Sequence, residues 1–117
     1  MKIAYGELIG GISGDMFVAA MIDLGLPLGK LKTELKNIPT LKFDLKVSKK
    51  TVHAIRATQF SVICPRHEPP RSWQQIRRLL ERSKLTAPVK TTTIAIFTRL
   101  AQAEAMVRAA FADEPTY

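Results

Sequence analysis

A glycine-rich turn near the start of the chain, residues 10–15, holds the residue types best suited to binding an ion. Three glycines in five positions indicate a tight turn that can adopt positive φ angles. A helix that begins directly after such a turn presents free backbone N–H groups, which bind phosphate or carboxylate. Asp15 would lie in the first helical turn, where it could hold a cation instead. We therefore expect an anion- or cation-binding turn formed by Gly11, Ser13, Gly14 and Asp15, with a purely structural turn as the open alternative.

Few other residues have the chemistry of metal ligands. Glu7 is the nearest acid before Asp15 in the sequence. His67 follows Cys64 in a C-x-x-H pair, which is at most half of a metal site. We name Glu7, Asp15 and His67 as candidate metal ligands. Because Cys64 is the only cysteine, an internal disulfide framework is excluded and the cytoplasm is the expected compartment.

The net charge of +8 is concentrated in the middle of the chain. Residues 30–56 carry a balance of +6, residues 66–90 a balance of +5, and the rest of the chain a balance of −3. Such a field attracts phosphates, nucleotides, nucleic acid or an acidic protein. On the second segment Arg78 and Arg82 share a helix face, and Trp73 could stack on a base or close the edge of the core.

Hydrophobic periodicity over the 117 residues predicts one domain, 1–117, of the α/β class, more narrowly an α+β two-layer fold. Its elements follow the order β-α-α-β-β-α-α and form a small three-stranded sheet with the helices packed on it. The first strand is expected to pair in parallel with one strand of the later hairpin. The predicted elements are a strand at 3–9, helices at 16–24 and 27–38, strands at 41–47 and 55–64, and helices at 72–84 and 87–112.

The last predicted helix is longer than a domain of this size needs to cover its own sheet. Its apolar residues recur at spacings of three and four, namely Val89, Thr93, Ile96, Leu100, Ala103, Val107 and Ala110. We expect one end of this helix to pack on another chain or on a domain that the sequence does not contain.

The turn from Gly11 to Met16, Gly-Ile-Ser-Gly-Asp-Met, resembles the amino terminus of the LarC nickel-insertion family. Tyr5 before it and Asp23-Leu24-Gly25 after it also match the family pattern, as does the run Arg99-Leu100-Ala101-Gln102-Ala103-Glu104-Ala105. The resemblance spans nearly this whole chain but only about the first quarter of a typical member.

The resemblance implies a role in inserting nickel into a pyridinium dithiocarboxylate mononucleotide, with CTP hydrolysis, to make the nickel pincer cofactor of lactate racemase. A complete member is therefore a nickel chelatase, a lyase. Its CTP site belongs to the carboxyl-terminal part, so CTP is not expected on this segment. The family's histidine-rich loop, a nickel reservoir, is reduced here to His67, and its first-strand Asp is Glu7.

We therefore expect a truncated or divergent LarC-like amino-terminal domain that is not catalytic alone. Its partner would be the missing carboxyl-terminal part or a second copy of the chain, with an anionic small molecule as a further partner. The alternatives are a basic module that binds nucleic acid or an acidic protein, and an assembly domain that dimerises through its last helix. The sequence contains no apolar stretch long enough to cross a membrane.

Overall fold

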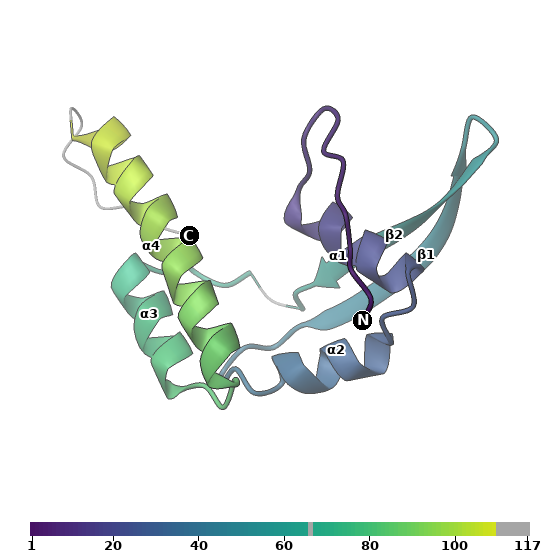
Figure 1. The fold of residues 1–117 in the computed structure, drawn as a ribbon. Coiled ribbons are helices and arrows are strands. Elements are labelled where there is room, and N and C mark those ends of the chain that lie inside the picture. The colour runs from purple at the N-terminus through teal and green to yellow at the C-terminus, as the bar shows by residue number, and fades with distance from the viewer. Residues whose placement is uncertain (66, 110–117) are drawn as a thin grey trace.

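The computed structural model describes residues 1–65 and 67–109. Over these ranges the chain is an α+β structure of four helices and one two-stranded antiparallel sheet (Figure 1). The elements in chain order are α1 (Gly14–Asp23), α2 (Leu28–Leu35), β1 (Asp44–Val52), β2 (Ile55–Ile63), α3 (Trp73–Arg82) and α4 (Ala87–Arg108). The helices and the hairpin lie where the sequence predicts them, apart from shifted ends and residues 110–112, which lie outside the described residues.

The hairpin is closed by a two-residue turn. Val52 pairs with Ile55, so His53 and Ala54 alone connect the strands, and their φ angles are 48° and 63°. Two left-handed residues in succession are the pattern of a type I′ turn, whose twist matches that of the flanking strands. The sequence predicts the turn near 51–54 but not its type, because neither Asn nor Gly occupies it.

A small core forms where α1 and α2 cover the hairpin. Its buried members are Ala19 from α1, Leu45 from β1 and Phe60 from β2. Partly buried side chains surround them, namely Val18, Ile22, Leu28, Leu31, Leu35, Phe43 and Val47. Within the described ranges no side chain is less than 2 % exposed, so this core is shallow.

Helices α3 and α4 form a separate antiparallel pair beside this core (Figure 1). Ser72 begins α3 with the capping box that the sequence predicts: its hydroxyl accepts a hydrogen bond from the backbone of Gln75, whose side chain accepts one from the backbone of Ser72. Trp73 stacks on Phe97 of α4 with ring centroids 5.9 Å apart. Trp73 therefore closes the edge of a core, which is one of the two roles that the sequence predicts for it.

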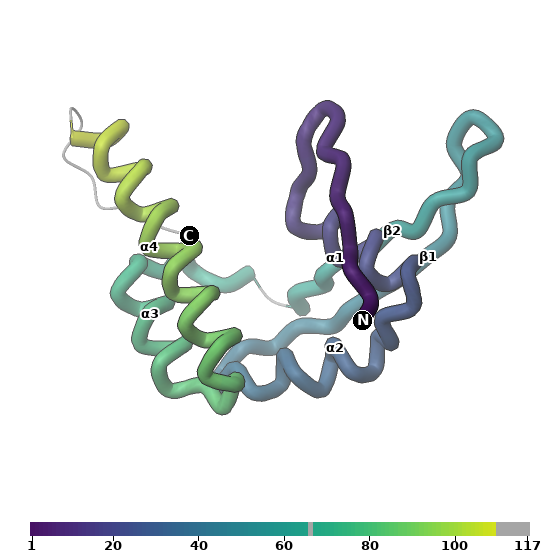
Figure 2. The backbone as a smooth tube through the Cα atoms, viewed as in Figure 1, coloured from purple at the N-terminus to yellow at the C-terminus, as the bar shows by residue number. Residues whose placement is uncertain are grey.

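The predicted three-stranded sheet is not found. In the described part of the chain the sheet has two strands, β1 and β2, and residues 3–9 adopt no strand pairing. Figure 2 shows residues 1–13 as a loop that projects beyond α1. Ile3 and Tyr5 are 80 % and 87 % exposed. The apolar pattern of 3–9 is that of a strand, but such a pattern does not by itself bring a segment to a sheet edge. In the described structure β1 and β2 each keep one edge unpaired, and residues 3–9 do not join either of them.

The apolar stripe of α4 is also uncovered. Ile96 is 63 % exposed and Val107 is 73 % exposed, whereas Ala101, on another side of the helix, is buried. The helix thus packs on α3 through a different face from the stripe that its periodicity marks. The stripe is left without a neighbour in the described structure.

The molecule as a whole is open. It exposes 9640 Å², whereas a folded monomer of this mass exposes about 6,300 Å². Its radius of gyration is 16.6 Å, against about 13 Å for a compact domain of this length. The fold therefore leaves much more surface in solvent than a compact domain of this size does.

Candidate functional site

The glycine turn lies in an open position at the start of α1. Gly10 and Gly11 have φ angles of 79° and 89°, and the N–H of Gly11 donates to the carbonyl of Leu8 over 3.2 Å. These left-handed angles suit glycine and strain other residues. A Cβ added at Gly11 or Gly14 would meet no atom within 4 Å, so the turn has free space around it.

Ser13 and Asp15 interact directly. Ser13 precedes α1 in an extended conformation, as an N-cap residue does, but its side chain does not cap the helix backbone. Its hydroxyl donates instead to the Asp15 carboxylate. This hydroxyl, together with the backbone N–H of Met16, lowers the pKa of Asp15 from its ordinary value.

The ionised Asp15 changes what the turn can bind. The carboxylate lies at the positive end of the helix dipole, where a negative charge is stabilised. A phosphate or carboxylate ligand would be repelled by it, while a cation would be attracted. The carboxylate by itself therefore favours a cation, whereas Lys50, which lines the same cavity as Asp15, carries the opposite charge.

Asp15 lines a cavity of about 240 Å³ between α1 and the hairpin. Lys50, Val52 and Gln59 of the hairpin contribute to the same cavity. Sequence reasoning missed these hairpin residues, because only the packing of α1 on β2 brings them to Asp15. No pattern in the sequence of β1 and β2 indicates that Lys50, Val52 and Gln59 lie beside Asp15.

The other two candidate ligands lie elsewhere. Glu7 is exposed on the projecting amino-terminal segment, and His67 is exposed in the loop between β2 and α3. Within residues 1–65 and 67–109, no three His, Cys, Asp or Glu side chains are grouped closely enough to hold a metal ion. Metal binding by Glu7, Asp15 and His67 stays a prediction.

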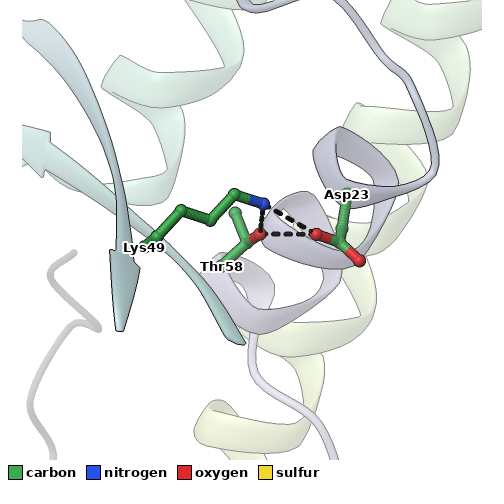
Figure 3. Close-up of polar contacts among 3 residues, drawn as sticks. All are labelled: Asp23, Lys49 and Thr58. Carbon is green, nitrogen blue, oxygen red and sulfur yellow. Dashed lines mark hydrogen bonds and ion pairs between the residues drawn. The ribbon is translucent and has the colours of Figure 1, made fainter. Parts of the chain in front are cut away.

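A polar cluster anchors the end of α1 to the hairpin (Figure 3). The hydroxyl of Thr58 donates to Asp23 Oδ1 over 2.6 Å, and Lys49 Nζ donates to the same oxygen over 3.0 Å. Lys49 Nζ also lies 2.6 Å from Thr58 Oγ1, its cross-strand partner. The Thr58 hydroxyl first and Lys49 second lower the pKa of Asp23. The cluster adds polar contacts at the end of α1 to the apolar packing of this helix on the hairpin.

Comparisons with known proteins show the family to which this chain belongs. The family model described as "Nickel insertion protein" matches residues 4–115. Proteins that carry the name "Putative nickel insertion protein" are similar along almost the whole chain. The one from Geobacter sp. (strain M21) is 42 % identical over 92 % of this chain, and that from Dictyoglomus thermophilum is 36 % identical over 97 %. The chain belongs to the nickel insertion protein family.

The chain spans less than a third of these relatives. It covers 28 % of the Geobacter protein and 30 % of the Dictyoglomus protein, and it covers 27 % of a relative from Syntrophobacter fumaroxidans that is 41 % identical. No match was found among the solved structures. In the part of the chain that the structure describes, no helix combines the length and the apolar character needed to span a membrane.

Proposed function

We propose that this chain is the amino-terminal domain of a nickel insertion protein and that it works only together with the remainder of such a protein. The observation that carries the proposal is the exposed surface, which exceeds that of a folded monomer of this mass by about 3,300 Å². A standard protein–protein interface covers about 800 Å² on each partner. The excess is therefore large enough for extensive docking by another part of the protein.

The exposed apolar residues support this proposal by their location. Many of them lie on the projecting segment 1–13 and on α4, whose stripe includes Ile96 and Leu100, and the rest lie on or beside α1 and on the hairpin. Apolar surface of this extent is usually covered in a working protein. We infer that the remainder of the nickel insertion protein covers this apolar surface. The alternative is that a second copy of this chain covers it.

The reaction would be the transfer of nickel into a pyridinium dithiocarboxylate mononucleotide, with CTP hydrolysis performed outside this segment. Nickel is the cargo of this reaction. In it the turn at Gly11, Ser13, Gly14 and Asp15 would offer one carboxylate to the metal, and further ligands would come from the remainder. We expect the site to lie in the cytoplasm, where Cys64, exposed in the described structure, stays reduced.

A metallation assay tests the proposal. The 117-residue chain is mixed with nickel ions, CTP and the mononucleotide precursor, and the nickel product is measured by mass spectrometry. We expect no product from the chain alone, and product once the remainder of a full-length relative is added. Metallation by the unaided chain would show that the domain is catalytic by itself.

A further inference from the structure

Two cavities adjoin the turn between α2 and β1. The first, of about 670 Å³, has apolar walls that include Leu41 and Phe43 and is bordered by three lysines, Lys32, Lys36 and Lys42. The second, of about 470 Å³, is bordered by three arginines, Arg71, Arg78 and Arg82. Pro39 and Thr40 line both cavities. The two cavities are therefore neighbours that share one wall.

The fold brings the two basic segments of the sequence together at this place. The lysines come from residues 30–56 and the arginines from residues 66–90. One backbone hydrogen bond joins the segments: the N–H of Lys84, after α3, donates to the carbonyl of Asn37, after α2, over 2.9 Å. Lys90 Nζ donates to the carbonyl of Ser83 over 2.9 Å and so holds the end of α3 to α4.

Within residues 1–65 and 67–109, carboxylates neutralise two of the six cations. Lys32 pairs with Asp44 over 3.1 Å, and Arg71 pairs with Glu68. Over the described ranges, Lys36 and Lys42 form no ion pair. The same is true, within those residues, of Arg78 and Arg82. Four uncompensated charges around concave, partly apolar walls concentrate the positive potential there and attract anions.

The shape and lining favour a small ligand over a nucleic acid. The volumes are those of small-molecule sites, and Arg and Lys side chains are the usual partners of phosphate oxygens. Single-stranded nucleic acid is instead held by stacking its bases on free aromatic rings. Trp73, the aromatic residue at the start of α3, is already stacked on Phe97.

We propose that the paired cavities beside Pro39 and Thr40 form one binding site for a small molecule that carries several phosphate groups, held by Lys36 and Lys42 on one side and by Arg78 and Arg82 on the other. The site is separate from the glycine turn, and it does not depend on the proposed role in nickel insertion. An elongated polyphosphate reaches both groups of cations, whereas orthophosphate can contact only one.

Calorimetric titration of the 117-residue chain with inorganic tripolyphosphate at low salt tests the site. We expect one binding event per chain and at least tenfold weaker binding of orthophosphate. The variants Lys36→Ala and Arg78→Ala should each weaken tripolyphosphate binding at least tenfold. Both side chains are exposed, so neither change is expected to unfold the chain, and circular dichroism checks this.

Arg56→Ala and Arg99→Ala are matched controls, because each removes one exposed positive charge from outside the two cavities. They should change the affinity less than twofold. Absence of binding, or equal losses in all four variants, would overturn the site. A 20-nucleotide single strand that binds and is not displaced by tripolyphosphate would also overturn it, in favour of a nucleic-acid surface.

Discussion

Ala54 occupies a backbone conformation that costs free energy. Its φ angle of 63° places it in the left-handed region, which disfavours any residue with a Cβ by about 1–2 kcal/mol. Glycine avoids this cost but loses more entropy on folding, about 0.4–1 kcal/mol. We expect Ala54→Gly to raise the free energy of unfolding by about 0.5–1 kcal/mol, measured by urea denaturation.

Ala57→Gly is the matched control for this substitution. Ala57 lies within β2 and pairs with Lys50, so glycine there should lower the free energy of unfolding by about 0.5–1 kcal/mol. The two substitutions are chemically identical and are expected to differ in sign. A loss of stability in both would show that the turn at Ala54 is not left-handed.

Asp23 makes the docking of α1 depend on pH. Its pKa is lowered from 3.8 by the Thr58 hydroxyl and then by Lys49. The contribution of these contacts to stability is therefore fully present above pH 3.8 and is lost as the pH falls through the lowered pKa. Asp23→Asn should make the loss of stability below pH 3.8 less steep, as measured by thermal unfolding at a series of pH values.

Glu34→Gln serves as the control for Asp23→Asn. Among the residues that the structure describes, the Glu34 side chain takes part in no ion pair. Its loss should leave the acid dependence of unfolding as it is in the unchanged chain. An equal flattening in both variants would contradict the role of the contacts with Thr58 and Lys49.

The residues of the candidate site could be predicted only in part from the sequence. The glycine spacing predicted the turn, and the capping tendency of serine predicted Ser13 at the N-cap position, although its side chain makes no cap hydrogen bond there. The bond from its hydroxyl to Asp15 could not be predicted, because that choice depends on side-chain rotamers at the turn. Lys50 and Gln59 line the same cavity as Asp15 only because of tertiary packing, and the local sequence carries no signal of that packing.

At the scale of elements, local patterns predicted four helices and the hairpin. The capping box at Ser72, the helical spacing of leucines in α2 and the alternation along the hairpin all act within a few residues. Residues 3–9 have the apolar pattern of a strand but form none, because joining a sheet depends on tertiary contacts that a local pattern does not encode. Within the described structure both strands of the sheet pair only with each other.

The exposed stripe of α4 leads to a prediction about association. Ile96→Glu and Leu100→Glu should leave the helical content of the 117-residue chain unchanged, because these side chains are exposed in it. Each should weaken binding of the remainder of a full-length relative at least tenfold, because a buried, unpaired carboxylate is costly. Sedimentation velocity of the mixed proteins measures this binding.

Gln102→Glu is the control, since it introduces the same charge at an exposed polar position of the same helix. It should leave the association within twofold of that of the unchanged chain. Undiminished association of the Ile96→Glu and Leu100→Glu variants would show that the stripe is not the docking face.

At the scale of the whole molecule, the sequence predicts a longer last helix than the domain needs but not how open the molecule is. The radius of gyration of 16.6 Å reflects two packed units, α1–α2 on the hairpin and α3 on α4, with little shared core. Periodicity shows which face of a helix is apolar; it does not show whether a neighbour covers that face. The uncovered stripe of α4 is therefore visible only in the structure.

Amide hydrogen exchange tests most directly the claim that the exposed faces dock on the remainder of a nickel insertion protein. Exchange is measured in the 117-residue chain alone and after the remainder of the Geobacter relative is added. We predict slower exchange in residues 1–13 and along α4, with the hairpin unchanged. Unchanged exchange in both segments, although the folded remainder is present, would contradict the account.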